Sequence, residues 1–97
     1  LFRPKSVAVV GASPNASFVS SILGSLFTYG YPGTVSAINP RYERVMQAPC
    51  YPSVTDVPGE VDLVVIGVAA QRVPSVLEQC ERKGVGGVCV VTSGFSQ

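Results

Sequence analysis

Continuous hydrophobic runs separated by polar, glycine-rich segments dominate the chain. Residues 6–10, 61–68 and 88–92 form three such runs. All three predict strands, and the continuous run of residues 6–10 is typical of a parallel strand buried on both faces, because a strand with one solvent-facing side would alternate. Residues 34–38 alternate more clearly and predict a further strand. The apolar character of the chain favours a sheet that is covered on both faces, or a surface that packs on further segments of the protein.

Two segments between these runs carry hydrophobic residues at helical spacing, namely residues 18–29 and 72–83. Ser17 is the expected N-cap of the first helix, and Gly30 and Gly84 are the expected C-terminal stops. The residues expected on the buried face of the second helix are Val73, Val76, Leu77 and Cys80. The other face is expected to carry Arg72, Ser75, Glu78, Gln79, Arg82 and Lys83.

Strand and helix patterns alternate along the chain. Residues 41–51 are expected to form a loop between the second and third strands, and residues 53–58 a short helical turn. Such alternation implies right-handed crossovers, so the predicted class is α/β with a parallel sheet of at least four strands. Ligands of such sheets bind beyond the carboxyl ends of the strands. The strand exits to consider are 11–20, 39–42, 68–73 and 92–94.

Composition narrows the classes of function. The chain has 97 residues, of which 46% are hydrophobic and 13% charged, with a net charge of +1. This excludes a disordered chain and offers no electrostatic basis for binding nucleic acid or a membrane surface. The longest apolar run, residues 63–68, is far shorter than the ~20 residues of a membrane span. Because the chain has no histidine, it supplies no histidine base, metal ligand or phosphohistidine.

Three cysteines, at positions 50, 80 and 89, form no C-x-x-C pair, so neither a disulfide framework nor a zinc site is expected. Each is expected to be a free, buried or half-buried thiol in a reducing compartment, which favours the cytoplasm. The chain shows no signal peptide and no initiator methionine. We expect residues 1–97 to be one domain of a longer protein.

The first strand exit has the character of a phosphate-binding loop. Gly11 permits a tight turn, and the small residues Ala12 and Ser13 let backbone N–H groups approach an anion. Ser13, Asn15 and Ser17 offer further hydrogen bonds, and the following helix offers its positive end. The segment matches neither G-x-G-x-x-G nor a P-loop, and a purely structural turn is the alternative.

The second strand exit bears on the identity of the ligand. In an NAD site an Asp or Glu at this position binds the ribose hydroxyls, whereas this strand ends in Asn39, Pro40 and Arg41. Asn39 can hydrogen-bond a ribose or adenine, and Pro40 can wall an adenine pocket. Arg41 and Arg44 can meet a phosphate on the ribose, as in NADP or coenzyme A. The alternative is an Asn-Pro turn with solvated arginines.

Together these residues resemble the CoA-binding domain of the NDP-forming acyl-CoA synthetases, whose relatives include the succinyl-CoA synthetase α-subunit. The matching pieces occur in family order and span nearly the whole chain. They are residues 6–13, 30–33, 38–41, 50–54, 61–66, 80–85 and 93–95.

The resemblance implies a Rossmann-like three-layer fold that holds coenzyme A as substrate or ligand. The residues that would cradle the CoA phosphates are Gly11, Ala12, Ser13, Val19 and Ser20. Those expected beside the adenosine are Asn39, Pro40 and Arg41. Those expected to line the adenine or pantetheine side are Val68, Ala69, Ala70 and Val73, with Ser93 and Gly94 at the thiol end.

In that family, complete enzymes interconvert acyl-CoA, phosphate and NDP with free acid, CoA and NTP, through an acyl phosphate and a phosphohistidine. The resemblance implies that the phosphohistidine and ATP-grasp domains lie elsewhere, in the same or a partner chain, and that this chain holds no catalytic residue and no metal. The chain departs from the usual family residues at Ser20, Gln47, Ala69 and Gln97.

Three other functions stay open. A regulatory module on the same fold would sense CoA, acyl-CoA or another nucleotide for an attached domain such as a protein acetyltransferase. An NADP-binding domain would use Arg41 and Arg44 to read the 2′-phosphate. A structural domain would bind none of these ligands.

Overall fold

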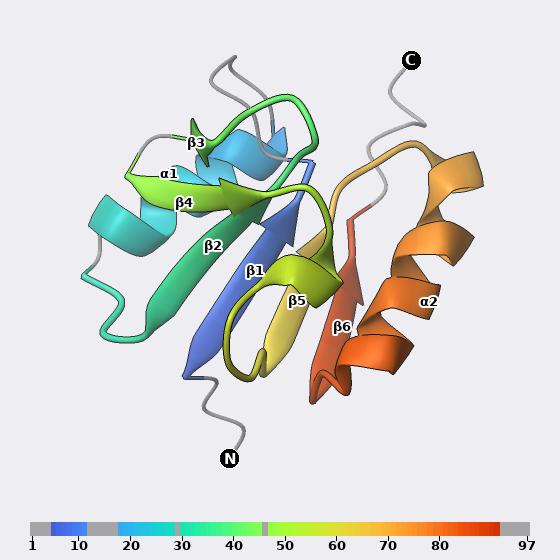
Figure 1. Ribbon diagram of the computed structural model, residues 1–97. Helices are drawn as coiled ribbons and strands as arrows, with labels where there is room; N and C mark the ends of the chain where they lie inside the picture. The colour runs from blue at the N-terminus through green and yellow to red at the C-terminus, as the bar shows by residue number, and fades with distance from the viewer. Residues whose placement is uncertain (1–4, 12–17, 29, 46, 92–97) are drawn as a thin grey trace.

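The computed structural model describes residues 5–11, 18–28, 30–45 and 47–91 (Figure 1). These residues form a three-layer α/β structure around one six-stranded sheet, with strand order β3-β4-β2-β1-β5-β6. The strands are β1 (Ser6–Val10), β2 (Thr34–Ile38), β3 (Arg44–Val45), β4 (Ala48–Tyr51), β5 (Leu63–Ile66) and β6 (Gly87–Val90). The helices are α1 (Phe18–Thr28) and α2 (Val73–Lys83), with short 3-10 turns η1 (Val54–Asp56) and η2 (Ala70–Arg72). The predicted α/β, Rossmann-like fold class is confirmed.

Strand β1 lies at the centre of the sheet and sets its topology. It pairs in parallel with β2 and with β5, and Val7 is in register with both Val35 and Leu63. The chain therefore leaves β1 toward one edge of the sheet and later returns through β5 toward the other. Because parallel crossovers are right-handed, the two directions place α1 and α2 on opposite faces (Figure 1).

Alternate residues of β1 face two separate hydrophobic cores. Val7 and Val9 pack on the α1 side, where Leu23 is fully buried. Ala8 and Val10 pack on the α2 side, against a cluster that includes Val76 and Cys80 of α2. Burying each valine or leucine stabilises the fold by about 1.5–3 kcal/mol. The double-sided burial explains why the strand shows a continuous rather than an alternating apolar run.

The segment expected to be a loop, residues 41–51, contains a strand pair instead. Strand β4 pairs in parallel with β2 and antiparallel with β3. The N–H of Cys50 donates to the Glu43 carbonyl at 2.9 Å, and the N–H of Asn39 donates to the Tyr51 carbonyl at 2.9 Å. The prediction missed this pair because the strands are too short for a period-2 pattern and because Pro49 has no N–H for a ladder.

The predicted last strand is present as β6, and most of its residues are exposed. In β6, Val88 and Val90 are 39% and 43% exposed, and Leu77 of α2 is 41% exposed. Cys89, expected to be at least half-buried, is also exposed, whereas Cys50 and Cys80 are buried free thiols. Among the described residues only β5 pairs with β6, so this strand lies at an edge. Leu77 lies about 100° around the helix from Val76, which points at the core.

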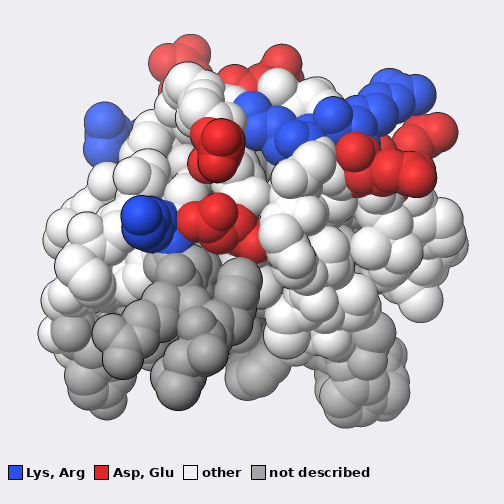
Figure 2. Space-filling view, turned by 90° about the horizontal axis from the view of Figure 1, so that it is seen from below, with Lys and Arg blue, Asp and Glu red and all other residues white. Residues whose placement is uncertain are grey.

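Charges of both signs are interspersed on the face at the amino ends of the strands (Figure 2). The side chain of Asp62 accepts a hydrogen bond from the Lys5 N–H at 2.7 Å and so ties the start of β1 to the start of β5. In the part of the chain that the structure describes, no helix is long and apolar enough to cross a membrane.

Candidate functional site

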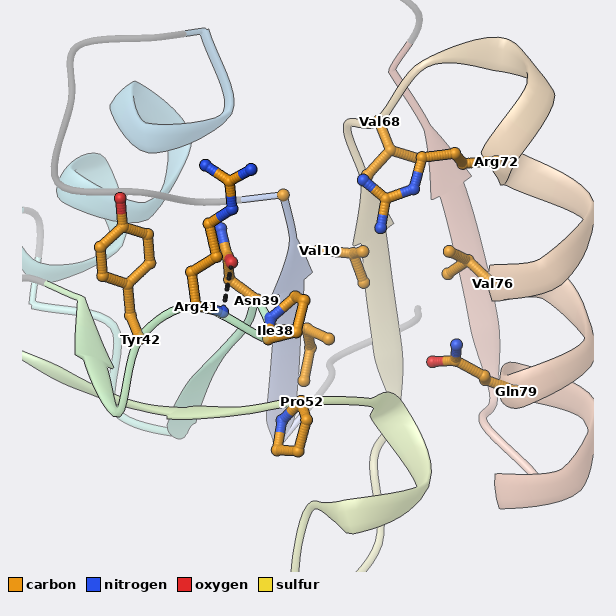
Figure 3. Close-up of a pocket in the computed structure, with 12 residues that line it drawn as sticks. Val10, Ile38, Asn39, Arg41, Tyr42, Pro52, Val68, Arg72, Val76 and Gln79 are labelled. Atoms are coloured by element: carbon orange, nitrogen blue, oxygen red, sulfur yellow. Dashed lines mark hydrogen bonds between the residues drawn. The ribbon is translucent and has the colours of Figure 1, made fainter.

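A pocket of about 340 Å³ opens at the carboxyl ends of β1, β2 and β5 (Figure 3). It lies where the strand order reverses, since the chain leaves β1 toward β2 and returns at β5. The lining residues come from the ends of β1 and β2, the β2–β3 connection, the segments that follow β4 and β5, and α2. They are Val10, Gly11, Ile38, Asn39, Pro40, Arg41, Tyr42, Pro52, Val68, Arg72, Val76 and Gln79.

Gly11 joins the exits of the three central strands. It has a φ of +97°, which favours glycine, and its N–H donates to the Ile38 carbonyl at 3.0 Å. A Cβ at this position would lie 2.4 Å from the Gly67 oxygen. The N–H of Gly67 in turn donates to the Val10 carbonyl at 2.9 Å. The turn after β1 thus requires glycine for both its conformation and its packing.

The β2 exit is held in place by Asn39. Its Oδ1 accepts a hydrogen bond from the Arg41 N–H at 2.9 Å, which closes a turn and directs the Arg41 side chain to the pocket rim (Figure 3). Its carbonyl accepts the Tyr42 N–H at 3.5 Å and the Cys50 thiol at 3.3 Å. Burial raises the pKa of the Cys50 thiol, and the hydrogen bond to Asn39 partly opposes this. Cys50 is therefore a neutral structural thiol in the α1-side core, which argues against a nucleophile.

The opposite wall is formed by the residues after β5. Arg72 ends η2, and its N–H donates to the Ala69 carbonyl at 2.8 Å. Gln79, expected on the solvent side of α2, instead lines the pocket, and its Oε1 accepts the Val54 N–H at 3.0 Å. This bond ties α2 to η1, which closely follows the lining residue Pro52.

The pocket is electropositive at its rim and apolar at its base. Arg41 and Arg72 are the charged residues among its described lining, and no carboxylate is among them. Arg44, for which a phosphate contact and a solvated side chain were both open, is directed elsewhere: its Nη1 donates to the Gln47 carbonyl at 3.1 Å. Such a site suits a ligand with an aromatic or apolar body and negatively charged groups.

The residues predicted for the site divide into three groups. Those that line the pocket are Gly11, Asn39, Pro40, Arg41 and Val68. Ala69 and Ala70 are exposed beside it, and Val73 packs half-buried against the α2-side core. Ala12, Ser13, Ser93 and Gly94 lie outside the described residues, as do the side chains of Val19 and Ser20.

Seven lining residues were not singled out from the sequence: Val10, Ile38, Tyr42, Pro52, Arg72, Val76 and Gln79. Tyr42 and Arg72 lie within the strand exits 39–42 and 68–73, so their positions alone carried a signal. Pro52 and Gln79 reach the pocket only through tertiary packing. Within the described ranges, no group of three or more His, Cys, Asp or Glu residues is placed to hold a metal ion.

Comparisons with known proteins agree with this geometry. Residues 5–97 match the family model described as a CoA binding domain. The chain is 46% identical over 98 residues to an ADP-forming acetate–CoA ligase I of Archaeoglobus fulgidus. The alignment covers 100% of this chain and 14% of the ligase. The chain thus spans only a small part of that enzyme.

Two solved structures share the fold. The apo form of Ca. Korarchaeum cryptofilum dinucleotide forming acetyl-coenzyme A synthetase 1 superposes with a TM-score of 0.92 at 45% identity, over 98% of this chain and 21% of that one. A hypothetical protein from Pyrococcus horikoshii OT3 superposes with a TM-score of 0.78 at 30% identity, over 93% and 77% of the two chains. On the match of residues 5–97, this chain belongs to the CoA-binding domain family and is homologous to ADP-forming acyl-CoA synthetases.

Proposed function

We propose that the chain is the coenzyme A-binding domain of an NDP-forming acyl-CoA synthetase, and that the pocket at the carboxyl edge holds the adenosine part of CoA. The observation that carries the proposal is a pocket at the point of strand reversal with arginines and no carboxylate in its described lining. A carboxylate at the β2 exit would favour the free ribose hydroxyls of NAD, whereas Arg41 favours a phosphorylated ribose.

The walls of the pocket suit a flat, weakly polar adenine ring. Val10, Ile38 and Val76 form an aliphatic floor of the pocket, and Pro40 and Pro52 add rigid sides. A volume of about 340 Å³ is at the lower end of ligand pockets, which run from about 300 to 1,000 Å³. We therefore assign only the adenosine to it, with the rest of CoA running along the carboxyl edge of the sheet.

The diphosphate belongs, in this proposal, at the connection between β1 and α1. Gly11 has a positive φ and packs closely in its turn. Because it has no side chain, the CoA diphosphate can pass over its backbone. The helix that follows, α1, is 11 residues long and directs its positive end toward the same edge of the sheet. The backbone of residues 11–13 and the start of α1 near Val19 and Ser20 would bind the phosphates, and Ser93 and Gly94 would lie at the thiol end.

In the reaction, the role of this domain is to hold CoA, whose thiol accepts the acyl group. The complete enzyme would interconvert acyl-CoA, phosphate and NDP with free acid, CoA and NTP. In the acyl-CoA-forming direction, the CoA sulfur attacks the carbonyl carbon of an acyl phosphate and phosphate leaves. The phosphohistidine and ATP-grasp domains would belong to other parts of the protein, since this chain has no histidine. Residues 1–97 would then be one domain of that longer protein.

Parallel ligand titration of the 97-residue chain tests the proposal. We expect CoA and acetyl-CoA to raise the melting temperature, and NADH and NADPH to leave it unchanged. Ligand at about 100 times its Kd adds about 2.7 kcal/mol, which for a domain of this size is a shift on the order of 10 °C. A shift with NADPH alone would identify an NADP-binding domain, and no shift with any of the four would indicate a structural domain. Either outcome contradicts the proposal.

A further inference from the structure

Gly11 lies between the two strand exits that form the rim of the pocket. On one side its N–H donates to the Ile38 carbonyl at 3.0 Å. On the other side, an added Cβ would lie 2.4 Å from the Gly67 oxygen and 3.3 Å from Val68 Cγ1. A ligand group seated over Gly11 is therefore within reach of the β2 exit and of the β5 exit.

Each exit brings one arginine to the rim. Arg41 follows Ile38 by three residues, and its backbone is fixed by the bond to Asn39 Oδ1. Arg72 follows Val68 by four residues, and its backbone is fixed by the bond to the Ala69 carbonyl. Figure 3 shows the two guanidinium groups on the same rim, with the end of β1 between them. The two cations thus approach a ligand from opposite sides.

The pocket itself does not neutralise these charges. No Asp or Glu is among its described lining residues. The ion pair recorded within the described part of the chain joins Arg82 to Glu78 at 3.6 Å, on the exposed side of α2. Two guanidinium groups converging on one rim, without a carboxylate there, are suited to a ligand with more than one phosphate group.

We propose that Arg72 binds the diphosphate of CoA from the β5 side, while Arg41 binds the 3′-phosphate on the ribose. This inference rests on the proposed function. In Rossmann-like folds the ribose lies at the β2 exit, which puts a phosphate on that ribose next to Arg41. The diphosphate crosses the end of the first strand, which is where Arg72 reaches the rim. The two arginines therefore contact different phosphates and contribute differently to ligand choice.

Affinities for CoA and for dephospho-CoA, which lacks the 3′-phosphate, distinguish the two roles. We expect Arg72→Gln to weaken both ligands by the same factor, about 10- to 100-fold, because one charge-assisted contact is lost from each. Arg41→Gln should weaken CoA alone, so that the two affinities become similar. Adenosine, which has no phosphate, should bind Arg72→Gln and the unsubstituted chain equally. Calorimetry measures the first two ligands and an NMR titration the third.

Arg82→Gln is the matched control. It removes the same charge from a neighbouring position in the chain, since Arg72 directly precedes α2 and Arg82 lies within α2, but Arg82 pairs with Glu78 away from the pocket. It should leave all three affinities unchanged. Arg72→Lys, which keeps the charge and loses the planar pair of donors, should recover part of the affinity lost in Arg72→Gln.

Three outcomes would overturn the role of Arg72. A loss of CoA binding without a loss of dephospho-CoA binding would mean that Arg72 reads the 3′-phosphate. An equal loss for adenosine would mean that it contacts the base or only shapes the wall. No loss at all would mean that it does not contact the ligand. If the unsubstituted chain binds neither CoA nor dephospho-CoA, the proposed function itself is wrong, which is a distinct result.

Discussion

The side chain of Gln79 on α2 accepts a hydrogen bond from the backbone N–H of Val54 at 3.0 Å. The bond joins α2, which lines the pocket through Val76 and Gln79, to η1, which closely follows the lining residue Pro52. Val54 is completely buried, so Gln79 is the partner that its N–H uses in the absence of a regular ladder. A single side chain thus links the folding of η1 to the shape of the ligand site.

Gln79→Leu is expected to lower the free energy of unfolding by about 1–3 kcal/mol, because it leaves the Val54 N–H without its acceptor. The same variant should bind CoA less tightly, since Gln79 lines the pocket and its bond holds η1, which follows the lining residue Pro52. Urea unfolding and a CoA titration measure the two effects. Gln47→Ala, at an exposed position, is the control and should change neither. Unchanged stability in Gln79→Leu would show that the bond contributes nothing net.

Gly11→Ala is expected to destabilise the fold by at least about 2 kcal/mol, through strain at a φ of +97° and a clash with the Gly67 oxygen. It should also abolish measurable CoA binding. Gly59→Ala is a close control, because Gly59 has a φ of +77° but nothing within 4 Å of an added Cβ. It should cost about 1 kcal/mol, since only the backbone strain applies. Equal losses in the two variants, measured by urea unfolding, would contradict the close packing at Gly11.

One thiol should react quickly with Ellman's reagent in the native protein, and two should react only after unfolding. Cys89 is exposed, whereas Cys50 and Cys80 are buried, and burial raises the pKa of both buried thiols. A raised pKa leaves less of the reactive thiolate at neutral pH, and burial blocks access. Cys89→Ser should remove the fast phase. A fast phase that survives this substitution would mean that the α2-side core or the strand β4 opens readily.

Alkaline pH should destabilise the protein in a way that depends on the buried thiols. Burial raises the pKa of Cys50 and Cys80 above the ordinary value of 9.0. Above that pH the unfolded chain loses these protons while the folded protein keeps them, so the free energy of unfolding falls as the pH rises. Below about pH 8 both states are protonated and these thiols add no pH dependence.

The double substitution Cys50→Ala with Cys80→Ala should flatten this alkaline slope, as measured by urea unfolding at about pH 7.5 and about pH 10. Cys89→Ala, which removes an exposed thiol, should leave the slope unchanged. If the double variant keeps the full slope, another group is responsible, and Tyr31 is the first to examine, because burial and the charge of Asp62 raise its pKa.

The long elements could be predicted because their signals are local. The buried run of β1 and the helical spacing of α2 each reflect contacts that repeat within a single strand or helix. The left-handed cap at Gly84, with a φ of +77°, likewise follows from the residue itself. The hairpin of β3 and β4 could not be predicted in this way, because β3 has only two residues and β4 contains Pro49, which has no N–H for a ladder.

Exposure at the sheet edge also depended on partners. The runs of β5 and β6 look alike in sequence, yet β5 is covered on both sides while Val88 and Val90 remain exposed. A hydrophobic run indicates that a segment can be buried, but its neighbours in space decide whether that segment is buried. The same holds for Leu77, which is one helical step away from a buried position.

The sequence by itself determined the fold class, the strand exits at which a pocket lies and the need for glycine in the turn after β1, because these follow from local periodicity and from the conformational freedom of glycine. Tertiary structure alone decided which arginine joins Arg41. Arg44 and Arg72 both follow a strand exit by a few residues, but the hairpin directs Arg44 to the Gln47 carbonyl while the reversal of strand order brings Arg72 to the pocket. Such a choice depends on how distant segments meet, and no periodicity along the chain encodes it.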